Sequence, residues 1–275
     1  MINLPYLGID EKQLLNQIIM SKQSLNRTVL ENVKSAIFED YDDYSDNEMN
    51  LENMKPDIRI GNEEKELLHA SYKQGKKISE IKERIKKSMP DAIQEKCPYC
   101  MLSEPTTLDH YLDKGTFPEY SVYAKNLVPC CSYCNSLKGS KFLSDSGKRM
   151  FISFYFDEMP QTSFLKIYIG IKDNIPYIEQ FAIDFEEEKE VNEIIETHYA
   201  ELKLFDRYKL PISNRLSSLF YELRTYEEYS VDKLKEVIEL RIQTTEKIYG
   251  KNYWEVCLYK GVLKNEELLE LLCEK

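Results

Sequence analysis

Two Cys-x-x-Cys pairs stand close together in this sequence and bracket a short polar segment. Two intervening residues let both thiolates of a pair turn toward one ion, and four thiolates suit a closed tetrahedral zinc site. Five of the seven cysteines fall between residues 97 and 134, which favours metal binding over disulfides in a chain whose amino terminus lacks the features of a signal peptide. A redox dithiol is the less favoured alternative, because both pairs flank the same segment. The sequence therefore predicts a structural zinc ion held by Cys97, Cys100, Cys131 and Cys134.

The three remaining cysteines are expected to lie outside the zinc site. Cys130 directly precedes Cys131, and the two-residue spacing selects Cys131 as the partner of Cys134. Cys257 and Cys273 stand among apolar residues at helical spacing, so we expect them in the core.

A carboxylate and an imidazole stand side by side between the two pairs. Asp109 and His110 belong to the stretch Thr106–Tyr111, which has strand propensity. Neighbouring side chains of a strand point to opposite faces, so Asp109 can reach a metal while His110 addresses a water beside a substrate, and twist near a strand end brings the two toward one pocket. A carboxylate suits a hard cation such as Mg²⁺, and a neutral imidazole suits proton abstraction near pH 7. These residues predict hydrolytic chemistry.

At this point the chain resembles the HNH, or ββα-metal, endonuclease family, in the subtype with a Cys-x-x-Cys pair on either side of the motif. The match is carried by Cys97-Pro98-Tyr99-Cys100, Leu108-Asp109-His110-Tyr111, Asn126-Leu127-Val128-Pro129, and Cys131-Ser132-Tyr133-Cys134-Asn135 followed by Lys138-Gly139. The order of these segments makes the resemblance specific, since a lone Asp-His pair would mean little.

The resemblance implies a β-hairpin followed by a helix, with Asp109 and His110 on the first strand, Asn126 leading into the second and Asn135 on the helix. It implies that His110 is the general base, that Asp109 and Asn135 hold one divalent ion, and that Asn126 shapes the loop and orients the histidine. The third letter of the motif is Asn135 rather than a histidine, and an asparagine carbonyl favours Mg²⁺ or Mn²⁺ over zinc at the working site.

Two lysines follow the motif closely. Lys114 and Lys138 are expected to contact phosphate, although a plain surface lysine is an equal alternative at both positions. Asp113 stands where the family often has proline, so the loop before Lys114 is expected to depart from the family's geometry.

Charge is distributed unevenly along the chain. The formal net charge is -11, which argues against a strongly basic nucleic-acid binder, but residues 71–150 hold 14 Lys and Arg against 9 Asp and Glu. The expected helix over residues 63–89 contributes much of this charge. It could follow phosphates, or it could be a solvated face above an apolar stripe.

The rest of the pattern predicts a mainly helical α+β protein. We expect an N-terminal helical region over 1–90 with an exposed acidic linker at 39–57, the HNH module over 91–150, and a β-hairpin with helices over 151–275. Within these regions we expect strands at 150–155, 164–171 and 175–183, and helix breaks near Pro211, Gly250 and Gly261. No apolar run is long enough to span a membrane, so we expect a cytoplasmic protein.

These features predict a metal-dependent endonuclease that acts on DNA. The alternative is a zinc-stabilised nucleic-acid-binding or protein-interaction module without catalysis. Proteins of similar layout resemble effectors of bacterial anti-phage defence, which implies a regulatory ATPase or another defence-system protein as partner. One module cuts one strand, so duplex cleavage would need two copies, as in a homo-oligomer, or successive nicks.

Overall fold

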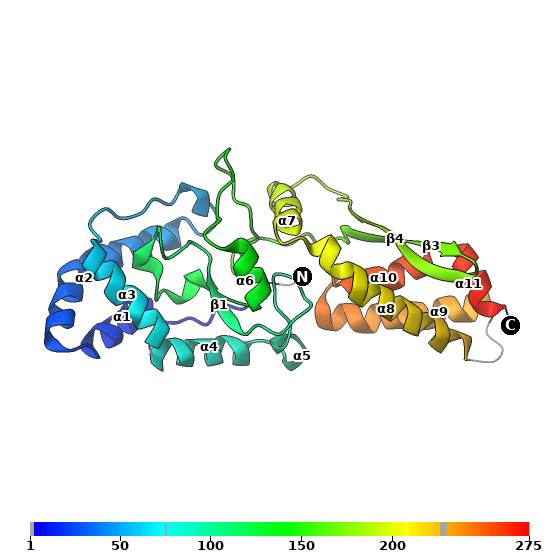
Figure 1. The fold of residues 1–275 in the computed structure, drawn as a ribbon, viewed down its shortest axis with the longest axis horizontal. Helices are drawn as coiled ribbons and strands as arrows, with labels where there is room; N and C mark the ends of the chain where they lie inside the picture. Colours follow the sequence, from blue (N-terminus) through cyan, green and yellow to red (C-terminus); the bar gives the residue numbers. More distant parts are fainter. Residues whose placement is uncertain (1–2, 75, 226–229, 275) are drawn as a thin grey trace. The chain divides into compact units, whose positions relative to one another are not determined.

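The computed structural model describes residues 3–74, 76–225 and 230–274. The pattern of contacts between residues divides the chain into two compact units. One comprises residues 3–158, and the other comprises the residues from 159 onward. Helices predominate, and the described residues also form two antiparallel sheets of two strands each (Figure 1). The expected mainly helical α+β class is therefore confirmed. Among the described residues, no helix combines the length and the apolar character needed to cross a membrane.

The unit of residues 3–158 contains six α-helices, three short 3-10 turns and one hairpin among its described residues. Its elements are α1 (Glu11–Met20), α2 (Ser24–Asp46), η1 (Leu51–Asn53), α3 (Asn62–Gln74), α4 (Lys76–Ser88), α5 (Asp91–Gln94), β1 (Thr107–His110), η2 (Pro118–Tyr120), η3 (Ala124–Asn126), β2 (Leu127–Cys130) and α6 (Ser132–Lys138).

The acidic linker expected at 39–57 is wrong over its first half, because α2 continues as far as Asp46. Tyr41 and Tyr44 lie on one face of that helix and are buried against Tyr120 and Tyr123, with ring centroids 4.2 to 6.3 Å apart. Burying four aromatic rings offsets the cost of ordering the surrounding acidic residues. The acidic side chains of residues 39–46 therefore belong to a folded helix and not to a linker.

The N-terminal helices and the motif belong to one unit, whereas the sequence placed a boundary near residue 90. Contacts far apart in sequence join them. The Glu11 carboxylate accepts a hydrogen bond from the Ala124 backbone N–H at 3.0 Å, and the Tyr120 hydroxyl donates to the Asp40 carbonyl at 3.0 Å. The motif is thus built into a helical unit.

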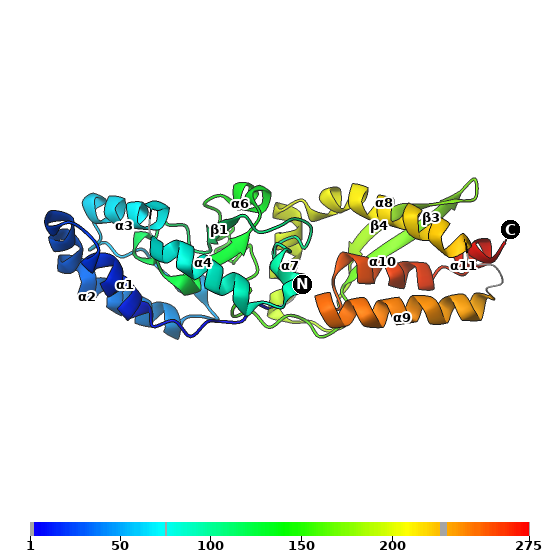
Figure 2. The same cartoon turned by 90° about the horizontal axis from the view of Figure 1, so that it is seen from below.

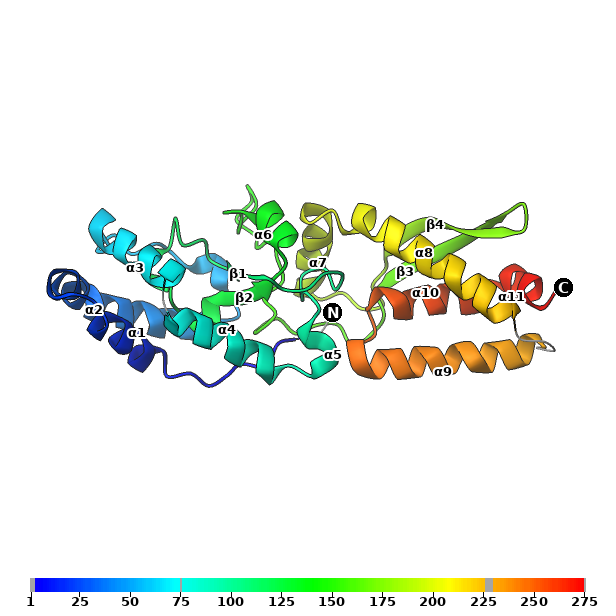
Figure 3. The ribbon, with the colours of Figure 1, turned by 60° about the horizontal axis from the view of Figure 1, so that its bottom comes forward.

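The β1–β2 hairpin carries the motif and has the arrangement that the resemblance implied. Asp109 pairs with Val128 and His110 pairs with Leu127, η3 leads into β2, and α6 follows. Helix α6 packs on β1, while α4 packs on β2 (Figure 3). Because side chains alternate along a strand, Thr107 and Asp109 share one face of β1, and His110 lies on the other.

The strand expected at 150–155 is not formed. Its backbone groups are bonded individually instead. The Phe154 carbonyl accepts from the Leu4 N–H at 2.8 Å, and the Phe151 carbonyl accepts from the Tyr111 hydroxyl at 2.7 Å. Phe151 and Phe154 are nevertheless buried, so the apolar pattern marks a core segment without a strand partner.

The second unit holds the predicted hairpin, β3 (Leu165–Lys172) and β4 (Ile175–Ile183), joined at Asp173 and Asn174. Both turn residues have positive φ, which a two-residue hairpin turn of type I′ requires at both of its central positions. Helices α8 and α10 pack against this sheet (Figure 2). The helices are α7 (Glu190–Glu201), α8 (Leu204–Arg224), α9 (Val231–Tyr249), α10 (Trp254–Leu263) and α11 (Glu266–Cys273).

Of the three helix breaks expected in this unit, those around Gly250 and Gly261 are formed and the one near Pro211 is not. Helix α9 ends at Tyr249, and Gly250 follows it with a positive φ. Pro211 lies inside α8, so the break expected there is wrong. The break expected around Gly261 comes shortly after it, since α10 ends at Leu263 and α11 begins at Glu266. Gly261 itself lies inside α10 and packs closely, since a Cβ placed there would lie 2.5 Å from the Ile167 carbonyl oxygen of β3.

Candidate metal and catalytic centre

Four cysteine side chains converge at the base of the β1–β2 hairpin. The sulfurs of Cys97, Cys100, Cys131 and Cys134 all lie within 4.8 Å of one another, and those of Cys100 and Cys131 are 3.9 Å apart. Four thiolates bound to one zinc at about 2.3 Å would stand about 3.8 Å apart in a tetrahedron. All four residues are buried. The cluster therefore fits a single zinc ion, with the cysteines that the spacing predicted.

Local backbone structure presents these sulfurs. The first pair lies in a turn in which the Met101 N–H donates to the Cys97 carbonyl at 2.7 Å, with Met101 at positive φ. In the second pair Cys131 is the N-cap of α6, and its sulfur accepts from the Cys134 N–H at 3.4 Å. Hydrogen bonds from the neighbouring thiols, that of Cys100 first, lower the pKa of Cys131 and so favour the thiolate that a metal needs.

Cys130 stays outside the cluster, as expected. Its sulfur lies 3.3 Å from the Thr107 hydroxyl, and burial raises its pKa to about 12. Cys130 is therefore a protonated core thiol next to a metal ligand.

His110 is held as a neutral imidazole. Its Nε2 lies 2.9 Å from the Ser121 carbonyl oxygen, and because a carbonyl only accepts, Nε2 carries the proton. The side chain is buried, and this desolvation lowers the pKa of His110 to about 3. Nδ1 then holds a lone pair, and among the described residues no hydrogen bond reaches it. This nitrogen can accept a proton from a bound water.

Helix α3 forms the wall against which His110 packs. The Tyr72 ring lies 4.3 Å from the imidazole between centroids, and the Tyr72 hydroxyl donates to the Leu108 carbonyl at 2.8 Å. One turn earlier, His69 bonds the Lys114 carbonyl at 2.8 Å through Nε2, and Lys65 donates to the Gly115 carbonyl. One face of α3 thus holds both strand β1 and the loop that follows it.

Sequence reasoning assigned no role to His69 or Tyr72, since neither belongs to the motif. Their spacing in the sequence could have indicated a shared helical face. Lys65, His69 and Tyr72 recur at intervals of four and three residues, which places them on one helical face. Lys114, expected at phosphate, extends over this wall with its ammonium 5.6 Å from the Tyr72 ring centroid.

Asn126 holds the loop between the two strands. Its side-chain oxygen accepts from the Leu112 N–H at 2.8 Å, while its Nδ2 donates to the Leu112 carbonyl at 3.0 Å and to the Tyr120 carbonyl at 3.3 Å. The loop fixed in this way ends next to Ser121, the partner of His110. Asn126 therefore fixes the conformation of this loop through both polar atoms of its side chain.

Asp109 is buried and already bonded. Lys138 Nζ lies 3.0 Å from its Oδ2 and 3.2 Å from its Oδ1, and the Tyr99 hydroxyl donates to Oδ2 at 2.8 Å. Lys138 itself is fully buried and also donates to the His110 carbonyl at 2.8 Å. This differs from the exposed phosphate contact expected of Lys138, because its ammonium compensates a carboxylate that burial would otherwise leave unpaired.

Asn135 lies on the same side of the hairpin as Asp109. Its Nδ2 donates to the Thr107 hydroxyl at 3.2 Å, and Thr107 shares the α6-facing side of β1 with Asp109. A carboxylate and an amide oxygen are the donors that Mg²⁺ or Mn²⁺ takes, so the chemistry of the pair fits the expected ion. The structure thus groups Asp109, Asn135 and Lys138 on one side and His110, Tyr72 and Lys114 on the other.

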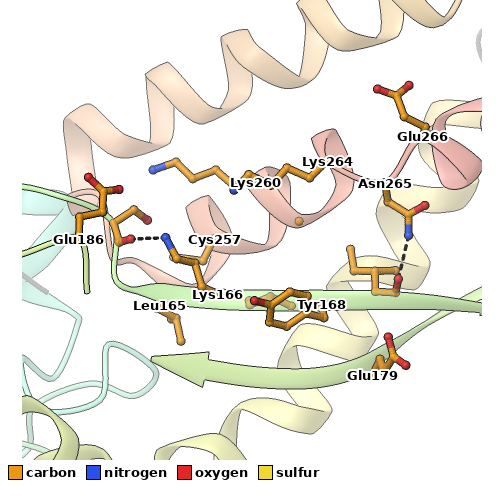
Figure 4. A pocket seen from close by; sticks show the side chains of 14 residues that line it. Leu165, Lys166, Tyr168, Glu179, Glu186, Cys257, Lys260, Lys264, Asn265 and Glu266 are labelled. Atoms are coloured by element: carbon orange, nitrogen blue, oxygen red, sulfur yellow. Dashed lines mark hydrogen bonds between the residues drawn. The ribbon is translucent and has the colours of Figure 1, made fainter. Parts of the chain in front are cut away.

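A separate cavity of about 650 Å³ lies in the second unit, between β3 and α10 (Figure 4). The positive and negative charges at its rim are equal in number. The charged rim residues are Lys166, Lys260, Lys264, Glu179, Glu186 and Glu266. None of the motif residues lines it.

The chain is 25% identical to Protein ea31 of Escherichia phage lambda over 196 residues. The match covers 63% of this chain and 63% of that protein. No family model matches the chain, and no solved structure does.

Proposed function

We propose that this protein is a metal-dependent endonuclease of the HNH type that hydrolyses DNA phosphodiester bonds. The observation that carries the proposal is the anchoring of His110, whose Nε2 donates to the Ser121 carbonyl and so leaves the Nδ1 lone pair for a proton. The surrounding hairpin and helix, fastened by four clustered cysteines, support it.

In this proposal each residue of the centre has one task. His110 takes the proton from the attacking water, while the Ser121 carbonyl and the Tyr72 ring hold the imidazole in place. Lys114 meets the phosphate on the His110 side. Asp109 and Asn135 would hold a Mg²⁺ or Mn²⁺ ion, which would supply neutralisation of the charge on the phosphate and the leaving oxygen.

The charge distribution supports a nucleic-acid substrate that is engaged locally. Helix α4 buries Ile78, Ile81 and Ile85 and presents lysines and Arg84 on its other faces, within the basic segment of an acidic chain. Each phosphate neutralised by such a surface would add salt-dependent affinity. The overall negative charge would slow nonspecific encounter with DNA.

The similarity to a phage protein supports a phage-related role. We propose that the protein serves as an effector in bacterial anti-phage defence, with a regulatory ATPase or another defence-system protein as partner. Co-purification from a native host tests this, because a monomer with full activity and no partner would contradict a required activator.

A plasmid-nicking assay tests the nuclease activity. Zinc-loaded protein should nick supercoiled DNA with Mg²⁺ or Mn²⁺ and not with EDTA. His110→Ala should lower the rate by about 10² to 10⁴-fold, the usual contribution of a general base. Lys172→Ala, a charge change on the β3–β4 hairpin, serves as the control and should nick at the wild-type rate. Nicking that survives His110→Ala would show that His110 is not the base.

One observation favours a second function, that of a zinc-stabilised nucleic-acid-binding or protein-interaction module. Both Asp109 oxygens are bonded to protein groups, as they would be in a purely structural role. The same assay separates the two. DNA binding in a gel-shift experiment, without nicking under any divalent ion, would favour the binding module.

A further inference from the structure

We propose that the Lys138 ammonium is the resident cation of the Asp109 carboxylate and that a divalent ion binds there only when Lys138 withdraws. This inference rests on the proposed function, since it concerns the ion expected at Asp109 and Asn135. It makes Lys138 a competitor of the metal, which the motif alone does not indicate.

The Asp109 carboxylate is almost fully occupied by protein groups. A carboxylate offers about four lone-pair positions. Lys138 Nζ bridges Oδ1 and Oδ2, and the Tyr99 hydroxyl takes a further position on Oδ2. The position left for another ligand is on Oδ1, the oxygen that Lys138 contacts at 3.2 Å.

A divalent ion on Asp109 would lie close to the Lys138 ammonium. A Mg²⁺ ion would lie about 2.1 Å from a carboxylate oxygen. With Lys138 Nζ 3.2 Å from the same oxygen, the ion and the ammonium would be at most about 5.3 Å apart. Asp109 and Lys138 are both buried, so water screens little of this repulsion. Simultaneous occupancy is therefore strongly disfavoured.

Lys138 stands at the C-terminal end of its helix. It is the last residue of α6, and Gly139 follows with a positive φ. The ammonium sits at the end of a flexible four-carbon stem, so its withdrawal requires rotation of a buried side chain and loss of the bond to the His110 carbonyl, but no unfolding of the helix. Asn135, one turn earlier on α6, keeps its place facing β1.

Binding of Mn²⁺ alone to the zinc-loaded protein, followed by electron paramagnetic resonance, tests the competition. Lys138→Met should bind Mn²⁺ at least tenfold more tightly than wild type, and Asp109→Asn should bind it at least tenfold more weakly. Lys87→Met, the same change on the exposed side of α4, is the control and should match wild type. Equal Mn²⁺ affinity for wild type and Lys138→Met overturns the inference.

Lys138→Met leaves a buried carboxylate without its partner, so a second measurement uses wild type alone. Acetylation of lysines, read by mass spectrometry, should leave Lys138 unmodified in metal-free buffer and modify it in saturating Mn²⁺. If Mn²⁺ binds while Lys138 stays protected, the inference fails and the proposed nuclease stands. If Mn²⁺ binds neither wild type nor Lys138→Met, the inference fails together with the metal-dependent part of the proposed function.

Discussion

Replacing His110 with glutamine should remove a specific acid sensitivity of the β1–β2 hairpin. In the unfolded chain a histidine has a pKa near 6.5, whereas burial lowers the pKa of His110 to about 3 in the folded protein. Between these values the unfolded state binds more protons, so the free energy of unfolding falls as the pH falls. The stabilising contribution is complete above pH 6.5 and is lost on acidification.

The size of the effect follows from these two values. Going from pH 8 to pH 5.5, protonation of the unfolded histidine costs the folded state about 1.4 kcal/mol. Glutamine does not titrate, and its amide can still donate to the Ser121 carbonyl. Wild type should therefore lose about 1.4 kcal/mol more than His110→Gln over this interval.

Hydrogen exchange of peptides from the hairpin, followed by mass spectrometry, gives the free energy of local opening at both pH values. Ile37→Val, a buried change without a titrating group, is the control and should change stability equally at both. Groups common to all three proteins cancel in the difference. Equal pH dependence in wild type and His110→Gln would mean that the pKa of His110 is the same in the folded and unfolded states, which would refute the lowering of this pKa by burial.

Three further predictions concern other parts of the molecule. Purified protein should hold about one zinc ion per chain by elemental analysis. Cys131→Ala should lose that zinc while Cys130→Ala keeps it, and the reverse result would place the wrong cysteine in the cluster. Burial raises the pKa of the Glu119 carboxyl to about 8, so the folded state holds an extra proton below that pH and stability falls as the pH rises. Urea titrations should show that Glu119→Gln abolishes a loss on the order of 2 kcal/mol between pH 6 and pH 8.5, and a variant as pH-sensitive as wild type would refute it. Gly261→Ala should lower the stability of the second unit by about 1–3 kcal/mol through its clash with the Ile167 carbonyl, and an unchanged melting temperature would contradict that packing.

The sequence was most informative where the pattern is local. The zinc cluster depends on the spacing within each Cys-x-x-Cys pair, and the hairpin with its following helix depends on a short contiguous motif. The β3–β4 hairpin was equally readable, because Asp173-Asn174 separates two strand-forming runs and takes the required left-handed turn.

Packing between residues far apart in the sequence could not be predicted from such local patterns. The charged composition of residues 39–57 suggested an exposed linker, although Tyr41 and Tyr44, three residues apart, already marked a helical aromatic face. Lysine is rarely fully buried, so nothing near Lys138 indicated that it turns inward to Asp109. The placement of α3 over His110 depends on tertiary contacts that no local pattern specifies.

Because side chains of α3 hold the loop after β1, the motif segment alone does not contain all the contacts that shape the centre. A fragment restricted to residues 91–150 would keep all four cysteines yet lack Lys65, His69 and Tyr72, which hold the Gly115, Lys114 and Leu108 carbonyls. One side of the imidazole would then face solvent, and its desolvation, the main reason for its low pKa, would be lost. Grafting or truncating this centre therefore has to start no later than residue 62, the first residue of α3.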